Sequence, residues 1–169
     1  MSNTTTSQSS RFTIVNYEDA SPEVQAIYDD TKRRLQLPFV LNWFKCQGSN
    51  ATLLNGNWTK LKSTLMMGDV PNVLKQLIIY KVSKERNCEY CAHAHGIFAD
   101  SMSAMISDNP SFRATEDLES PLIPESFKTA IKIVTKAALH ANQISDTDFK
   151  QLQQVPLGRR TSRPTQLEG

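Results

Sequence analysis

Apolar residues recur along this chain with the three-to-four-residue period of an amphipathic helix. The clearest example lies in residues 50–67, where Leu54, Trp58, Leu61 and Leu65 fall on one face. A half-buried strand would instead show strict alternation of apolar and polar positions. The stripe therefore predicts a helix that buries one side.

Helix-end signals delimit the other predicted helices. Ser21 is a good N-cap and Pro22 suits the first helical position, so a helix is expected over residues 21–36. Ser145 and Asp148 resemble a capping box at the start of the last helix. The same reading predicts a short apolar segment and two longer helices, over 37–48, 72–86 and 125–142.

One short run is compatible with two kinds of structure. Residues 77–82, LIIYKV, are β-branched and aromatic enough to form a strand. The length of the surrounding pattern and the lack of a partner strand favour a helix. Residues 107–124 predict a loop of about 18 residues, a candidate lid or subunit contact. The chain is therefore predicted to be all-α.

A chain of 169 residues is long enough to bury a core without disulfides, and one domain is expected. The polar stretches at its two ends lack the apolar residues to join that core. We therefore expect a single all-helical domain over residues 13–153. The segments 1–12 and 154–169 are expected to be disordered tails.

The charge balance argues against two classes of partner. A formal net charge of +2, with scattered Lys and Arg, gives no reason to expect nucleic acid or a membrane surface. No apolar run approaches the roughly 18 residues that a membrane span needs. The first residues lack the apolar core of a signal peptide. A cytoplasmic protein is expected.

The three cysteines carry most of the candidate chemistry. Cys46 stands alone among aromatic residues and is expected to be a small buried apolar side chain. Cys88 and Cys91 form a C-x-x-C pair inside KERNCEYCAHAHGIF, residues 84–98. In a chain without an export signal, such a pair is a redox or metal-binding candidate rather than a structural disulfide.

The helix that carries this pair is predicted to start at Asn87, a good N-cap. Counting from there places six residues on one continuous face, expected to turn toward the core: Cys88, Cys91, His95, Phe98, Met102 and Met105. Unpaired N–H groups at a helix start favour a thiolate. The spacing of the cysteines permits a disulfide, and His95 lies one turn on, within reach to move a proton.

Two other interpretations of the motif stay open. Cys88, Cys91 and His95 could bind zinc with a fourth ligand from another segment, although no second C-x-x-C is present. Both cysteines could also be inert core residues. His93 lies off the stripe and is expected to be a surface residue. A dithiol–disulfide pair without a cofactor is the favoured interpretation.

Residues 74–99, LKQLIIYKVSKERNCEYCAHAHGIFA, resemble the core of the alkylhydroperoxidase D-like proteins in the carboxymuconolactone decarboxylase superfamily. The family pattern is an apolar helix followed by N-C-x-Y-C-x-x-x-H, and the resemblance extends over residues 15–153. It implies an all-helical fold that assembles into homo-oligomers, either trimers or hexamers. It also implies antioxidant activity of the peroxiredoxin type.

The resemblance also implies roles for particular residues. Cys91 would attack a small hydroperoxide, Cys88 would close the disulfide, and His95 would take part in a proton relay. An unidentified dithiol reductant would then restore both thiols. The helix-dipole argument instead favours Cys88 as the reactive thiolate, because it is nearer the helix start.

The chain departs from the family pattern at the relay. Where relatives usually have a glutamate, twelve residues before Cys88, this chain has Gln76, which cannot carry a proton. Glu85 is a candidate replacement, although a surface carboxylate at the helix end is the favoured interpretation of this residue. Tyr90 replaces a histidine that relatives sometimes have between the cysteines.

Two hypotheses of function follow. The first is a thiol-dependent peroxidase that reduces small hydroperoxides through Cys88, Cys91 and His95. The second is a redox-responsive or disulfide-exchange interaction protein without peroxidase turnover, in which Gln76 reflects lost catalysis. A lactone decarboxylase is a weaker third hypothesis, because superfamily members with that chemistry generally lack a C-x-x-C pair.

Overall fold

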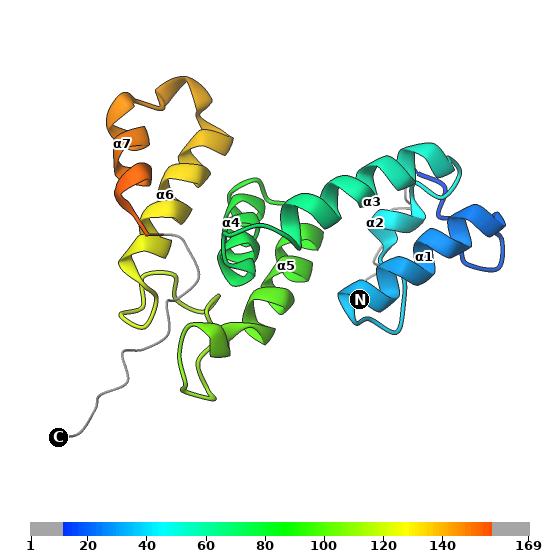
Figure 1. Ribbon diagram of the computed structural model, residues 1–169, viewed down its shortest axis with the longest axis horizontal. Helices are drawn as coiled ribbons and strands as arrows, with labels where there is room; N and C mark the ends of the chain where they lie inside the picture. The colour runs from blue at the N-terminus through cyan, green and yellow to red at the C-terminus, as the bar shows by residue number, and fades with distance from the viewer. Residues whose placement is uncertain (1–11, 157–169) are drawn as a thin grey trace, which may run out of the picture. The chain divides into compact units, whose positions relative to one another are not determined.

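The computed structural model describes residues 12–156, which form helices and turns without a β-strand among them (Figure 1). The predicted all-α fold class is confirmed. These residues fall into two compact units, divided between Met67 and Gly68. The single domain expected over 13–153 stays a prediction. Most of the expected tails, 1–12 and 154–169, lies outside the described residues.

The first unit contains three helices, α1 (Pro22–Leu35), α2 (Asn42–Lys45) and α3 (Ala51–Leu65). The predicted start of α1 is confirmed, because the Ser21 side chain accepts a hydrogen bond from a backbone N–H in the first turn. Asn50 caps α3 in the same way. Local signals thus set both helix starts.

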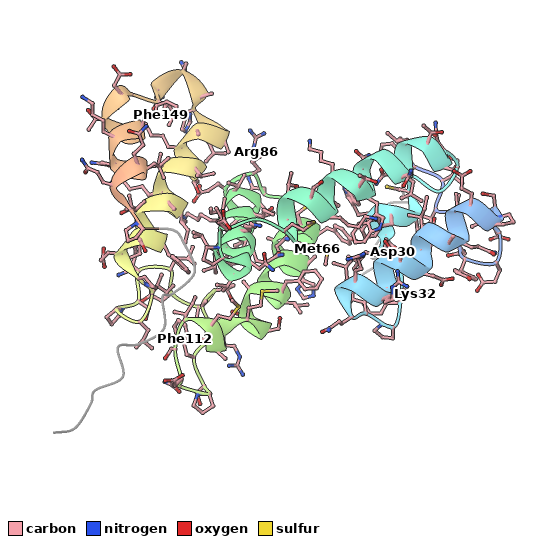
Figure 2. The ribbon with its side chains drawn as sticks, viewed as in Figure 1. Asp30, Lys32, Met66, Arg86, Phe112 and Phe149 are labelled. Carbon is pink, nitrogen blue, oxygen red and sulfur yellow. The ribbon has the colours of Figure 1, made fainter. Side chains whose placement is uncertain are left out.

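The core of the first unit is formed by aromatic and aliphatic side chains from all three helices. Tyr28, Phe44, Leu54 and Trp58 are almost completely buried there. Asp30 on α1 accepts a hydrogen bond of 2.7 Å from the indole N–H of Trp58 on α3. Figure 2 shows this carboxylate facing α3, where it joins the two helices at the edge of the core.

The second unit contains four α-helices, α4 (Asn72–Glu85), α5 (Glu89–Ser101), α6 (Glu125–Leu139) and α7 (Asp146–Gln154). Two short 3-10 helices, η1 (Ser103–Met105) and η2 (Ala141–Gln143), follow α5 and α6. Helix α4 packs against both α5 and α6 (Figure 1). The run LIIYKV lies inside α4, so the helical interpretation is confirmed.

The segment 107–124 is packed into the second unit. Phe112, Ala114 and Ile123 are buried in its core, together with residues of α4, α5 and α6. Figure 2 marks Phe112 on this segment. This burial argues against the lid expected from the segment's length, because a lid needs few core contacts.

The predicted capping box of α7 is present. The Ser145 hydroxyl accepts from the backbone N–H of Asp148, whose carboxylate accepts in return from the backbone of Ser145. Among the described residues, no helix is long and apolar enough to cross a membrane.

Candidate active site

The turn between α4 and α5 positions the first cysteine. The chain leaves α4 through Asn87, whose φ of 53° lies in the left-handed region that asparagine tolerates better than most residues. Cys88 follows as the N-cap of α5, and its backbone N–H donates to the carbonyl of Ser83 at 2.9 Å. The prediction of Asn87 as the N-cap is therefore wrong by one residue.

The two thiols of the C-x-x-C pair contact each other. Cys88 and Cys91 are both reduced and half-buried. The Cys91 thiol donates a hydrogen bond to the Cys88 sulfur, and together with burial and the negative charge of a Cys88 thiolate this raises the pKa of Cys91 to about 11. The Cys91 thiol is therefore protonated near neutral pH.

The buried face of α5 differs from the predicted stripe. Ala92, Gly96 and Ala99 face the core, whereas both cysteines and His95 are half-buried and Met105 is 54% exposed. Small residues at these positions allow α4 to approach closely. A methyl group added at Gly96 would lie 3.3 Å from the ring of Tyr80 on α4. The predicted stripe therefore forms a flank of the helix rather than its core face.

His95 is held by a side chain from the neighbouring helix. Its Nδ1 lies 2.6 Å from Oε1 of Gln76, which is only 5% exposed on α4. The amide oxygen accepts the Nδ1–H, so Nε2 is left as the acceptor nitrogen of the neutral ring. Burial lowers the pKa of His95 and favours this neutral form.

The other predicted relay residue lies on the surface. The carboxylate of Glu85 is 43% exposed and pairs with Lys81 at 2.6 Å. The hydrogen bond from Lys81 lowers the pKa of Glu85, so this carboxylate is ionised near neutral pH. The structure thus brings Gln76 and His95 together but holds Glu85 in a separate ion pair on the outer face of α4.

A pocket of about 460 Å³ opens beside Cys88, and we call it the Cys88 pocket. It lies entirely within the second unit, between α4, α5 and the segment 107–124. Most of its lining was not predicted from the sequence, because the residues are far apart in the chain or were assigned to the surface. The lining residues are Tyr80, Ser83, Lys84, Asn87, Cys88, Glu89, Ala92, His93, Gly96, Ile97, Asp100 and Thr115.

Cys46 is half-buried rather than fully buried as expected. Cys46 belongs to the first unit, where its thiol donates to the carbonyl of Trp43 at 3.2 Å. Within residues 12–156, no three side chains of the types His, Cys, Asp and Glu come together in a group that could hold a metal ion. The zinc interpretation therefore lacks a ligand set in the described part of the chain.

No protein-family model matches the sequence, and no curated protein matches it either. Solved structures do match. A peroxidase-related protein from Ralstonia eutropha JMP134, described as an alkylhydroperoxidase AhpD core, superposes with a TM-score of 0.67 at 16% identity, over 85% of this chain and 74% of the other.

Two further structures give the same result. The debrominase Bmp8 superposes with a TM-score of 0.69 at 19% identity, over 88% of this chain and 77% of its own. The alkylhydroperoxidase AhpD core from Rhodospirillum rubrum ATCC 11170 has a TM-score of 0.53 at 24% identity, over 83% and 97%. At these identities the likeness establishes the fold. The alkylhydroperoxidase D-like fold implied by the sequence resemblance is therefore confirmed.

Proposed function

We propose that this protein is a thiol-dependent peroxidase that reduces small hydroperoxides through a Cys88–Cys91 dithiol–disulfide cycle. The observation that carries the proposal is the placement of two free, half-buried cysteines at the start of α5, with Cys88 as its N-cap. Two sulfur atoms in contact at a helix start can share one proton when reduced and form one covalent bond when oxidised. The AhpD-like fold supports a peroxidase-related role.

The cycle balances without a metal or an organic cofactor. A thiolate attacks the distal oxygen of the hydroperoxide, the O–O bond breaks, and an alcohol leaves once its alkoxide is protonated. The resulting sulfenic acid is attacked by the second thiol, which forms the disulfide and releases water. A dithiol reductant, the partner that this cycle requires, then restores both thiols through a mixed disulfide.

We assign His95 to proton transfer. The neutral ring offers Nε2 as an acceptor one helical turn beyond Cys91, whose high pKa means that this thiol needs a base before it can react. Gln76 cannot carry a proton, and its role is to hold His95 in one orientation and one tautomer. Glu85 remains a candidate only if its ion pair with Lys81 opens.

The fold by itself does not identify the electrophile that the thiols attack, because one structural neighbour is a debrominase. The first experiment is therefore a thiol inventory by peptide mass spectrometry. Reduced protein is treated with one equivalent of hydroperoxide and alkylated. A Cys88–Cys91 disulfide within seconds, with Cys46 free, is the expected result. Thiols that stay reduced and alkylate slowly would remove the basis of the proposal.

One observation favours a second function. Gln76 is neutral where relatives usually have an acid, which fits a redox-responsive or disulfide-exchange protein that forms its disulfide without efficient turnover. Steady-state consumption of hydroperoxide with excess dithiothreitol separates the two functions. Many turnovers per subunit identify the peroxidase, and a single oxidation event identifies the redox-responsive protein. Serine at Cys46 is the matched control, because this cysteine lies in the other unit.

We propose a homo-oligomer, a trimer or hexamer, that works in the cytoplasm on small hydroperoxides, without nucleic-acid or membrane partners. Light scattering on the purified chain tests the assembly. A mass equal to one subunit would contradict it.

A further inference from the structure

Another pocket, of about 530 Å³, lies along α6, and we call it the α6 pocket. Helix α4, which packs beside α6 (Figure 1), and the segment 107–124 form its other walls. The α6 pocket therefore lies entirely within the second unit, and it shares no lining residue with the Cys88 pocket. Its volume is within the range usual for small-molecule sites.

A buried hydroxyl group without a partner belongs to the wall of this pocket. Thr135 is 8% exposed, and among the described residues its Oγ1 has no hydrogen-bond partner. Because Thr135 lies inside α6, its backbone groups are engaged in the helix, and its side chain is what it presents to the pocket. A buried hydroxyl without a partner costs stability. An acceptor atom of a ligand would remove this cost.

Two lysines that line the pocket lack strong partners. Lys128 and Lys132 lie one turn apart on the same face of α6, and Thr135 continues this face. The Lys128 side chain is only 14% exposed, yet its partner at 2.8 Å is the 86% exposed carboxylate of Glu125. Such surface pairs contribute little to stability. Within residues 12–156, the Lys132 side chain forms no ion pair. These two neighbouring cations therefore repel each other unless an anion binds between them.

The charges around the pocket favour an anion over a cation. Three lysines line it, the third being Lys81 of α4, against the two carboxylates of Glu119 and Glu125. Both glutamates are exposed, so their charges lie at the rim, whereas Lys81 is half-buried. Lys81 pairs at 2.6 Å with Glu85, which lies outside the lining. Lys132 is therefore the cation most available to a ligand.

We propose that the α6 pocket binds a small organic phosphate, a phosphate monoester with a compact apolar body. The phosphate accepts hydrogen bonds from the ammonium groups of Lys128 and Lys132 and from the hydroxyl of Thr135. Near neutral pH it carries a charge of about −1.5 to −2, which matches two lysines better than a single carboxylate does. Leu118 and Ile131, which also line the pocket, contact the apolar body.

Isothermal titration calorimetry of the reduced full chain with phenyl phosphate, at constant ionic strength, tests the site. Lys132→Ala should weaken binding by at least about tenfold, because it removes a charge-assisted hydrogen bond. Lys150→Ala, at an exposed lysine of α7 outside the pocket, is the control and should leave the affinity unchanged. Absence of binding to the natural chain, or an equal loss in the two variants, overturns the proposal.

Thr135→Val separates a role in binding from a role in the fold. Valine keeps the shape of the side chain and removes the unpartnered hydroxyl, so the free energy of unfolding should stay the same or rise. Binding of phenyl phosphate should weaken by about threefold to tenfold. A clear loss of stability would mean that the hydroxyl already has a partner within the protein. Unchanged binding would mean that the ligand does not reach it, and either result contradicts the proposal.

A comparison of two probes tests the apolar part of the ligand. Phenyl phosphate should bind at least about tenfold more tightly than inorganic phosphate, because only its ring is buried against Leu118 and Ile131. Equal affinities would contradict the assignment to an organic phosphate. None of these measurements uses a hydroperoxide, so their failure would leave the peroxidase proposal unaffected.

Discussion

The Nδ1 of His95 and the Oε1 of Gln76 lie 2.6 Å apart, which joins α5 to α4 through a neutral amide. A carboxylate at this position would favour the charged imidazolium, whereas the amide oxygen binds the Nδ1–H without adding negative charge. Because glutamine does not titrate, the contact keeps the same orientation of the ring over the whole pH range in which the protein is folded.

Replacing Gln76 by glutamate should raise the pKa of His95 by at least about one pH unit, because an adjacent carboxylate stabilises the imidazolium. In the natural chain burial lowers the pKa of His95. The glutamate would therefore raise this pKa toward and beyond the ordinary value of histidine. An NMR titration of the His95 ring measures it. Gln151→Glu, at an exposed position of α7, is the control. A pKa that stays low in Gln76→Glu would show that burial alone controls the ring.

Removing Cys88 should make Cys91 easier to ionise. The hydrogen bond to Cys88 is the largest cause that raises the pKa of Cys91 to about 11. In Cys88→Ala this pKa should fall toward the ordinary value of about 8.5. Near pH 9, Cys91 should therefore react faster with iodoacetamide in the variant than in the natural chain.

The matched control for this experiment is Cys46→Ala. Its thiol bonds to the carbonyl of Trp43 in the first unit, so its loss should leave the alkylation rate of Cys91 unchanged. A rate that is equal in all three proteins would mean that the two sulfur atoms of the C-x-x-C pair do not interact in solution.

Asp30 should contribute strongly to the stability of the first unit. Its side chain is only 19% exposed and accepts hydrogen bonds from Trp58, Lys62 and Arg33. Asp30→Asn keeps the size but loses the charge, so the free energy of unfolding should fall by about 1–3 kcal/mol. Thermal unfolding followed by tryptophan fluorescence measures the loss. The more exposed Asp29, changed in the same way, should cost much less.

The contribution of Asp30 should also depend on pH. Burial opposes its charged form, but the hydrogen bonds from Trp58, Arg33 and Lys62 outweigh burial and hold the pKa of Asp30 well below its usual value. Its stabilisation is therefore fully present above about pH 4 and decreases as the pH falls toward the folded-state pKa. The difference between the natural chain and Asp30→Asn should therefore be constant above about pH 4 and shrink as the pH falls below it toward the folded-state pKa of Asp30. A constant difference would contradict the role of its charge.

Two glycines in the first unit should respond to alanine in opposite directions. A methyl group at Gly48 would overlap the Tyr28 hydroxyl and lie 2.8 Å from the Cβ of Val15, so Gly48→Ala should destabilise by about 1–3 kcal/mol. At Gly56, within α3, nothing lies within 4 Å of the added methyl. Gly56→Ala should stabilise by about 0.5–1 kcal/mol through helix propensity. Denaturant unfolding measures the change in the free energy of unfolding for each variant. Changes of the same sign in the two variants would contradict the packing around Gly48.

Much of the fold was predictable because its signals are local. Ser21 and Pro22 mark the start of α1, and the reciprocal contact of Ser145 and Asp148 marks the start of α7. Both signals act within a few residues of one another and need no knowledge of the rest of the chain. The apolar period over 50–67 likewise identified α3.

The site was only partly predictable, since it depends on contacts between helices. Spacing identified Cys88, Cys91 and His95, and the family comparison pointed to Gln76. Packing of α4 against small residues made a different face of α5 the buried one, and periodicity alone did not show this. The Gly96 position, a glycine inside a helix, was the one available signal of that close approach.

The turn at Asn87 gives the protein a control point that contains no reactive group. The left-handed backbone of Asn87 sets where α5 begins and therefore which residue is the N-cap of this helix. A β-branched residue at this position would be strained, and relief of the strain would move Cys88 relative to Cys91. A substitution at Asn87 is therefore expected to change the relative position of the two cysteines while it leaves every thiol and every titratable group unchanged.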